Sequence, residues 1–533
     1  MLLLAPPPPP PPMILTGATL WAEDRAQEGQ ALLIQRGRIA ALGTEAELRR
    51  RAPKAAVVKL EGGTLLPGFI EGHAHVEGLG KLAETVDLTG VASPQECLAR
   101  VAAWTLRNSE GWITGRGWDQ NLWPGKAFPT AEQLDAHTRS RPAFLRRVDG
   151  HAGWANSAAL KAAGINAETP DPEGGRIVRD AQGQPTGILI DRAMDRVEAL
   201  VPAPSAAQRE RWIRAGLLRL RALGFTAVCD MGGDVVTLSA YRRLEAANAL
   251  PIRVFSYFDW NPKVALAELR KPRGPLGFFQ VQGAKFYFDG ALGSRGARLL
   301  APYADAPDTQ GLWVMEPTSI GANARTVLKA GYQPAAHAIG DGANAAALEV
   351  LGTAWRGSGA RLKPRVEHAQ IVAPGDAQAF GAAGLVASVQ PMHLADDHAW
   401  TPARLGPERV ERAFPWRTLQ EGGAPLVFGS DAPIADANPF RALAAAETRQ
   451  NDAGSPDGGF NPGHALTRAE ALRAYTRTSA EVLGHRDLGV IRTGAVADLL
   501  WVQAPIHTLT PAQLRTLKPG RLWVNGRETG SAQ

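Results

Sequence analysis

Eight short apolar segments alternate with longer stretches of helical spacing through the middle of this chain, and that alternation constrains its fold most. The segments are rich in strand-forming residues, whereas stretches such as 205–224 repeat apolar residues at helical intervals. Alternating strands and helices predict a parallel sheet covered by helices, and eight such units predict a TIM (β/α)8 barrel of the α/β class. The eight segments are residues 65–76, 224–232, 251–259, 281–290, 332–341, 364–372, 384–391 and 424–433.

The two ends of the chain and one long insertion depart from this alternation. Residues 13–66 and 488–533 consist of short strand-like pieces separated by turn residues, so we expect them to pair into one small composite β-sandwich. The stretch between the first two barrel strands is far too long for a single βα loop. We therefore expect residues of about 80–204 to form an inserted subdomain within a barrel domain spanning 67–487.

The first 12 residues contain seven consecutive prolines, which predict a disordered Pro-rich tail. This segment lacks the basic start and the long apolar run of a signal peptide, and no stretch of 18 apolar residues occurs. The net charge of +6 is spread along 533 residues without a block of like charges. We expect a cytoplasmic protein that binds neither membranes nor nucleic acid.

Metal-binding residue types stand at the carboxyl ends of the predicted barrel strands, where TIM barrels carry their reactive groups. In the motif GHAHV, two histidines lie two residues apart, so on a strand both side chains point to the same face and can bind one ion. A lone His-X-His is weak evidence, but the combination across several strands predicts a metal site. The residues are His73, His75, Lys285, His337, His368 and Asp431.

Lys285 lies in the middle of VQGAKFYFDG, which otherwise has the pattern of a buried strand. A buried lysine needs a charge partner or must lose its proton. A neutral amine can add CO2 to give an anionic carbamate, which could bind metal. Pairing of Lys285 with Asp289 on the same strand face is the alternative, and the sequence leaves both open.

Five motifs, in this order, resemble the metal-dependent amidohydrolase superfamily: LLPGFIEGHAHV, GAKFYFDG, PAAHAIGD, VEHAQIV and FGSDAPI. Three further stretches, at 115–124, 129–160 and 171–191, resemble its amidohydrolase 3 group, also called YtcJ-like, which includes N-substituted formamide deformylases. The resemblance extends from Met13 to about Asn525.

This resemblance implies a binuclear metal centre. One ion would be held by His73, His75 and Asp431, the other by His337 and His368, with carboxylated Lys285 between them. Nitrogen ligands with carboxylates suit zinc best, with manganese, cobalt or iron as alternatives. Two such ions would lower the pKa of a shared water, and Asp431 would be the general base.

Signals for substrate binding are weaker. His151 and His393 could equally be ordinary loop residues, but the resemblance favours a place in the substrate pocket for both. Trp118 and Trp154 could line an apolar substrate site or could form the core of the insertion.

We expect hydrolysis of a carbon–nitrogen bond other than a peptide bond, in a small-molecule N-acyl or N-formyl amide. A mononuclear heterocycle deaminase is one alternative, although such relatives place a glutamate shortly after the histidine that corresponds to His337, and this chain has none there. A lactone or ester hydrolase and a non-catalytic scaffold are others. The oligomeric state is left open, with a homodimer among the options.

Overall fold

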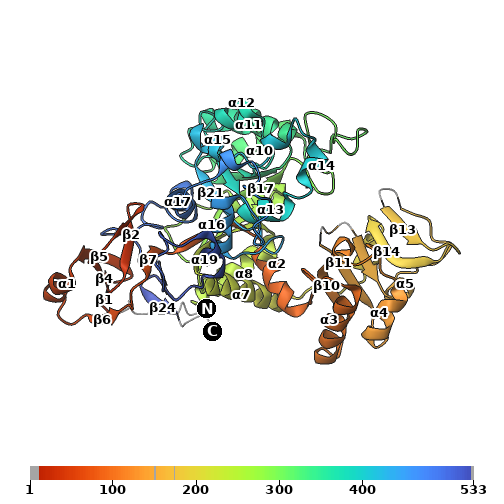
Figure 1. Cartoon of the computed structure of the whole chain (residues 1–533), viewed down its shortest axis with the longest axis horizontal. Coiled ribbons are helices and arrows are strands. Elements are labelled where there is room, and N and C mark those ends of the chain that lie inside the picture. The colour runs from red at the N-terminus through yellow and green to blue at the C-terminus, as the bar shows by residue number, and fades with distance from the viewer. Residues whose placement is uncertain (1–10, 149, 151, 173–174, 530–533) are drawn as a thin grey trace. The chain divides into compact units, whose positions relative to one another are not determined.

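The computed structural model describes residues 11–148, 150, 152–172 and 175–529, which form two compact units (Figure 1). The larger unit is formed by Met1–Val76 and Gly216–Gln533, and the smaller by Glu77–Ala215. The first ten residues of the predicted Pro-rich tail lie outside the described part of the chain.

The larger unit contains a sheet of eight parallel strands in the order β21-β20-β19-β18-β17-β16-β15-β8. This arrangement confirms the predicted TIM barrel, and each predicted segment supplies one strand. Residues 65–67 are the exception within the first segment, because they belong to a different sheet. The strands are β8 (Phe69–Ala74), β15 (Phe225–Gly233), β16 (Arg253–Asp259), β17 (Phe279–Tyr287), β18 (Gln333–Ala338), β19 (Arg365–His368), β20 (Val386–Val389) and β21 (Leu426–Phe428).

The barrel closes where β8 meets the residues that follow β21, and we call this junction the seam. The backbone N–H of Asp431 donates to the carbonyl oxygen of His73 at 2.7 Å, and that of His75 donates to Ala432 at 2.8 Å. Only glycine fits between these strands, because a Cβ atom at Gly72 would lie 2.4 Å from the carbonyl oxygen of Phe428. Closure therefore brings His73 and His75 against Asp431.

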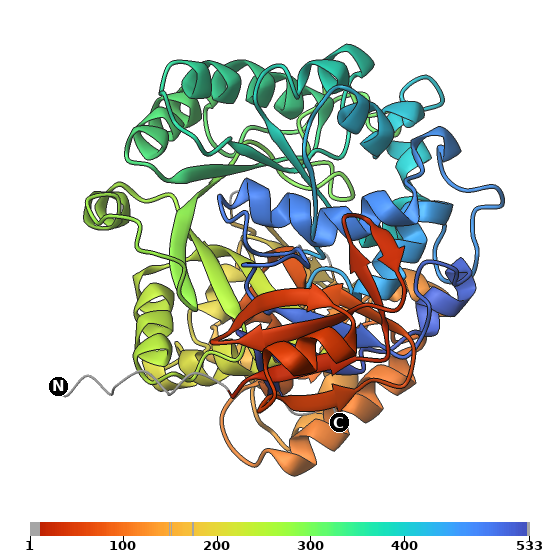
Figure 2. The ribbon, with the colours of Figure 1, turned by 90° about the vertical axis from the view of Figure 1, so that its left-hand side faces the viewer.

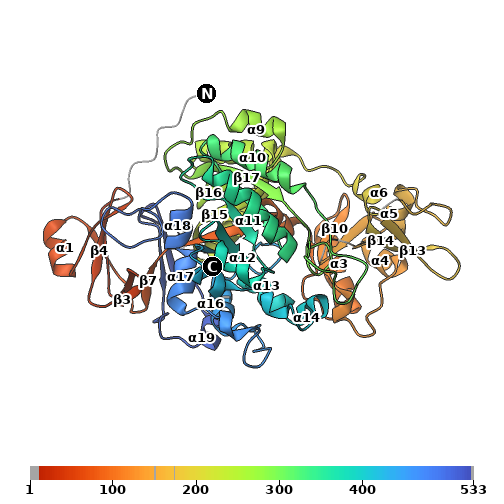
Figure 3. The same cartoon turned by 90° about the horizontal axis from the view of Figure 1, so that it is seen from above.

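Helices on the outside of the barrel bury small and branched side chains against it. Helices α10 (Pro317–Lys329) and α11 (Asp341–Arg356) lie side by side over β18 (Figure 3). Others are α8 (Val235–Ala246), α12 (Pro374–Ala379), α13 (Pro391–Asp397), α16 (Pro439–Thr448), α17 (Arg468–Tyr475) and α18 (Arg477–Val482). Within the described residues, no helix combines the length and the apolar character needed to cross a membrane.

The N-terminal strands, red in Figure 2, contribute to two small sheets of the larger unit, and C-terminal strands join one of these sheets. β7 (Thr64–Pro67) pairs antiparallel with β22 (Leu499–Val502), which places Leu66 opposite Leu500. Buried side chains, including Leu20, Leu32 and Trp523, form one apolar core. The other strands are β1 (Met13–Thr16), β2 (Thr19–Ala22), β3 (Arg25–Gln27), β4 (Ala31–Gln35), β5 (Arg38–Gly43), β6 (Ala56–Lys59), β23 (Arg521–Val524) and β24 (Arg527–Thr529).

The smaller unit has its own six-stranded sheet, in the order β13-β14-β12-β11-β10-β9, and its own apolar core. Helices α3 (Pro94–Arg107), α4 (Ala131–Thr138) and α5 (Ser157–Ala162) accompany this sheet (Figure 1). Its strands are β9 (Val86–Asp87), β10 (Ile113–Trp118), β11 (Ala143–Arg147), β12 (Ala152–Ala155), β13 (Gly175–Arg179) and β14 (Pro185–Asp191).

Candidate metal centre

Two histidines and an aspartate meet at the seam of the barrel. His73 lies on β8 and His75 directly follows this strand, while Asp431 follows β21. The Oδ1 atom of Asp431 lies 3.3 Å from Nε2 of His73 and 3.1 Å from Nε2 of His75. His73 is fully buried and Asp431 nearly so. The structure thus places these three predicted ligands around one point.

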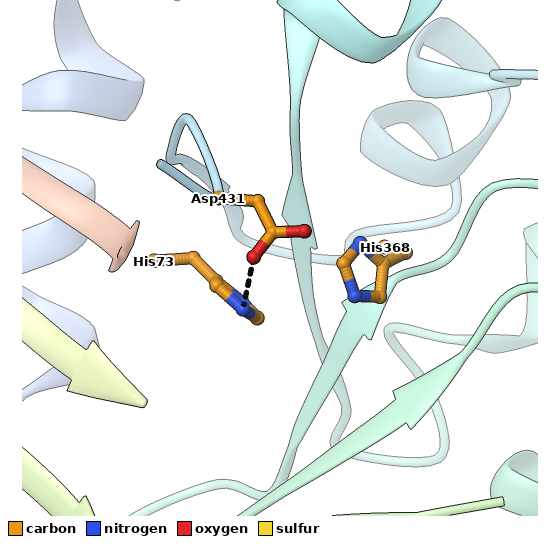
Figure 4. Close-up of side chains that lie close together, drawn as sticks. All are labelled: His73, His368 and Asp431. Carbon is orange, nitrogen blue, oxygen red and sulfur yellow. Dashed lines mark ion pairs between the residues drawn. The ribbon is translucent and has the colours of Figure 1, made fainter. Parts of the chain in front are cut away.

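Two more histidines extend this cluster. The ring of His368, at the end of β19, lies 5.1 Å from that of His73 and 4.5 Å from that of His337 on β18. Donor atoms of His73, His368 and Asp431 all lie within 4.8 Å of one another, and Figure 4 shows these side chains facing one another. The family resemblance implies that His368 binds a second ion with His337, whereas the structure brings His368 within reach of the first group as well.

Hydrogen bonds from outside the cluster fix which ring nitrogens carry protons. Nδ1 of His73 lies 2.7 Å from Oε2 of Glu367, and a carboxylate can only accept. Nδ1 of His368 lies 2.9 Å from Oε1 of Gln390, whose Nε2 donates to the carbonyl oxygen of Ser388. Both rings therefore hold the proton on Nδ1 and direct the lone pair of Nε2 toward the cluster.

The buried donor atoms of the cluster fit a metal ion. Nε2 of His73 and Oδ1 of Asp431 are buried without a hydrogen-bond partner among the described residues, although they face each other at 3.3 Å. Two lone pairs at this distance repel unless a cation lies between them. Burial lowers the pKa of His337 to about 3, which keeps that ring in the neutral form that binds metals.

The backbone of the seam is held by a further buried carboxylate. Oε1 of Glu71 accepts hydrogen bonds from the backbone N–H groups of His73 at 3.0 Å and Ser430 at 2.8 Å. Glu71 thereby links His73 to Ser430, the residue before Asp431. His368 and Asp431 adopt positive φ angles of 76° and 60°, a costly conformation that is typical of functional sites.

Lys285 lies on β17 with only 1% of its surface exposed, and burial lowers the pKa of its ammonium group. Within the described ranges, its Nζ makes no hydrogen bond or ion pair, and it lies 5.2 Å from the ring centre of Tyr287. The alternative partner, Asp289, instead accepts backbone hydrogen bonds from Arg298, Ile339 and Gly340. The structure therefore disfavours pairing of Lys285 with Asp289.

The four predicted substrate contacts have different outcomes. His393, on α13, stacks on His368 with 5.7 Å between ring centres, and its Nε2 lies 3.6 Å from Oδ2 of Asp431. His151 lies outside the described residues. Trp118 and Trp154 are fully buried in the core of the smaller unit, where their indole N–H groups donate to backbone carbonyls. Contact of these residues with substrate stays a prediction.

Four residues that support the centre were not predicted from the sequence: Glu71, Arg365, Glu367 and Gln390. Each is buried and polar on or beside a barrel strand. The visible signal was a charged residue inside an apolar strand, as in PRVEHAQIV, but it does not reveal which ligand the charge contacts.

Comparison with known proteins places the chain in a family. Residues 56–529 match the amidohydrolase family, and residues 31–55 match an imidazolonepropionase-like composite domain of bacteria. The chain therefore belongs to the amidohydrolase family, and the resemblance to its amidohydrolase 3 group is confirmed. It is a hydrolase of this family whose barrel carries a candidate metal centre.

Three relatives cover nearly the whole chain. Protein LONG AFTER FAR-RED 3 from Arabidopsis thaliana is 34% identical, covering 92% of this chain and 86% of its own length. The putative amidohydrolase YtcJ from Bacillus subtilis is 31% identical, with 93% and 95% covered. N-substituted formamide deformylase from Arthrobacter pascens is 29% identical, with 96% and 97% covered.

A solved structure has the same fold. The crystal structure of an uncharacterized metal-dependent hydrolase from Pyrococcus horikoshii matches with a TM-score of 0.80 and 27% sequence identity. The match covers 94% of this chain and 99% of that one.

Proposed function

We propose that this protein is a metal-dependent hydrolase that cleaves the carbon–nitrogen bond of a small N-acyl or N-formyl amide. The observation that carries the proposal is the convergence of one donor atom each from His73, His368 and Asp431 at the carboxyl ends of the barrel strands. Similarity to a formamide deformylase supports cleavage of a carbon–nitrogen bond, and similarity to a metal-dependent hydrolase supports the use of a metal ion.

Two divalent ions would be held by His73, His75, His337, His368 and Asp431. Imidazole nitrogens with a carboxylate favour zinc, with manganese, cobalt and iron as alternatives. Lys285, which is buried near these ligands without a polar partner, would bridge the ions as a carbamate. When bound, the ions would polarise the substrate carbonyl and lower the pKa of a water molecule.

The two oxygens of Asp431 would have separate roles. Oδ1 faces His73 and His75, whereas Oδ2 faces His393. Asp431 would accept the proton of the attacking water on Oδ2 and pass it to the leaving nitrogen. His393, which faces Oδ2, would orient this carboxylate and the substrate.

Other reactions use the same barrel and remain alternatives. A mononuclear deaminase is disfavoured because Ala338, Ile339 and Gly340 follow His337 where such enzymes have a glutamate. A lactone or ester would present a similar carbonyl to the same site. A scaffold without activity is the third alternative, since the name of one relative, LONG AFTER FAR-RED 3, describes no reaction.

An activity screen of the zinc-loaded protein tests the proposal. N-formyl, N-acetyl and aryl amides are compared with a lactone and with a cytosine-like base. We expect amine release from at least one amide and none of the other reactions. Ammonia release from the base alone would contradict the proposed reaction and indicate a deaminase. Hydrolysis of the lactone alone would contradict it and indicate a lactonase. Absence of any turnover together with absence of bound metal would favour the scaffold.

The proposed substrate is a small molecule, so neither nucleic acid nor membrane is needed for activity. A cytoplasmic location and a homodimer stay predictions.

A further inference from the structure

An ion pair lies inside the barrel beside the candidate metal centre. Arg365 and Glu367 are both on β19, and neither side chain has exposed surface. Nε of Arg365 donates to Oε1 of Glu367 at 2.8 Å. The interior of a TIM barrel is ordinarily filled by layers of branched apolar side chains, so a guanidinium in this position requires an explanation.

Arg365 connects β19 with four other barrel strands. Its Nη2 donates to the carbonyl oxygen of Gly72 on β8 at 2.6 Å. The remaining contacts are with Oγ of Ser388 on β20 at 2.9 Å, the hydroxyl of Tyr257 on β16 at 3.3 Å and Sγ of Cys229 on β15 at 3.4 Å. Every strand that Arg365 reaches is thus held relative to β19.

Stability alone does not account for this pair. Removing two charges from water costs about as much as their attraction returns, and apolar replacements of buried ion pairs are often as stable. A role in positioning a neighbouring group is therefore the better explanation, provided that such a group is in contact.

The group in contact is His73. Oε2 of Glu367 accepts a hydrogen bond from Nδ1 of its ring at 2.7 Å, while Arg365 binds the carbonyl oxygen of the residue just before it. The pair thus contacts both the ring of His73 and the backbone immediately before it. The hydrogen bond fixes the proton on Nδ1, and the backbone contact fixes the position of β8.

We infer that Arg365 and Glu367 are positioning residues, which hold His73 in the tautomer and orientation that bind a metal ion and add little to the stability of the fold. The inference rests on the proposed function in requiring that His73 is a metal ligand.

A double variant tests this inference without leaving an unpaired buried charge. In Arg365→Met/Glu367→Leu the pair is replaced by apolar side chains of similar size. The matched control is Arg253→Met/Asp498→Leu, because Arg253 and Asp498 form another buried ion pair of the larger unit, 2.7 Å long, without contact to a proposed ligand. Affinity for Zn²⁺ is measured by competition with a chromophoric chelator, and Co²⁺ binding by its absorption spectrum.

We expect the first variant to bind Zn²⁺ about 10–100-fold more weakly than wild type, with an altered Co²⁺ spectrum and a similar melting temperature. The control should retain wild-type affinity. Wild-type affinity in the first variant, or equal losses in both, would overturn the inference. Absence of metal binding by the wild-type protein would instead contradict the proposed function.

If the first double variant does not fold, the single variant Glu367→Gln tests the inference. This variant keeps the size of the side chain and an oxygen that can accept from His73, but it removes the negative charge. We expect about tenfold weaker Zn²⁺ binding, and unchanged affinity would contradict the inference.

Discussion

Oδ1 of Asp431 and Nε2 of His73 lie 3.3 Å apart at the barrel seam, and neither atom has a hydrogen-bond partner in the described part of the chain. The other oxygen of Asp431 faces His393 instead. One carboxylate is therefore placed both to bind an ion and to accept a proton, and replacement of a single oxygen should separate these roles.

Asp431→Asn should lower kcat about 10²–10⁴-fold, because an amide cannot accept the proton of the attacking water. KM should change less than kcat, because the amide oxygen that faces His73 and His75 can still bind the ion. Steady-state kinetics on the best amide substrate provides the measurement. Asp457→Asn, in an exposed loop, is the matched control. A kcat within twofold of wild type would exclude Asp431 as the base.

Removal of metal should destabilise the larger unit, because the converging lone pairs of His73, His368 and Asp431 then repel one another. Binding of zinc at 1,000 times its Kd should stabilise the protein by about 4 kcal/mol. The free energy of unfolding is measured in denaturant with and without zinc after chelation. His73→Ala should show no such zinc dependence, and equal zinc stabilisation in this variant would place the site elsewhere.

Lys285→Ala should abolish amide hydrolysis and weaken retention of at least one metal ion, because the bridging anion is lost. In the wild-type protein, ¹³C-labelled bicarbonate should give a carbamate signal by NMR that is missing in the variant. Lys263→Ala, at an exposed position of α9 (Pro262–Glu268), is the control. Full activity with two tightly bound metals in Lys285→Ala would rule out the carbamate.

Part of this site could be predicted from the sequence alone. The alternation of apolar and helical segments locates the strand ends, and reactive groups of a barrel stand at those ends. His73, His368 and Asp431 were found in this way, and the structure brings them together. The His-X-His spacing was enough to predict that His73 and His75 lie together, because both stand at the end of one strand.

The supporting residues could not be predicted, because their roles depend on contacts between distant strands. Glu367 reaches His73 across 294 positions of sequence, and only the closed barrel sets that distance. Trp118 and Trp154 illustrate the opposite problem. A tryptophan in the sequence has the same appearance in a core as in a pocket, and only the structure shows that these two lie in the core of the smaller unit.

Gly72→Ala should open the seam of the barrel. The new Cβ atom would lie 2.4 Å from the carbonyl oxygen of Phe428, which cannot move without disturbing β21. We expect a loss of about 1–3 kcal/mol in the free energy of unfolding, measured in urea, together with weaker zinc binding. Gly375→Ala on α12 meets no atom within 4 Å and should be neutral or stabilising by about 0.5–1 kcal/mol. Equal stability of the two variants would contradict this account of the seam.

His485 should make the larger unit less stable in mild acid. Its Nε2 lies 2.9 Å from Oε1 of Gln280, and its ring packs on Phe255. Burial, followed by the charge of Arg273, lowers its pKa to about 4 from the ordinary value of about 6.5. The unfolded chain therefore binds a proton below pH 6.5 that the folded protein binds only near pH 4. The associated stability is complete above pH 6.5 and is lost as the pH falls toward 4.

Because the ring is only partly buried, we expect this loss to be about 1–2 kcal/mol, smaller than the full pKa difference would give. His485→Gln keeps a polar side chain that does not titrate, so its free energy of unfolding should fall less between pH 7 and pH 5. His137→Gln, in the smaller unit, controls for removal of a histidine without these contacts. Parallel pH profiles of wild type and His485→Gln, measured by denaturation in urea, would show that the imidazole of His485 is free to take up its proton in the folded protein.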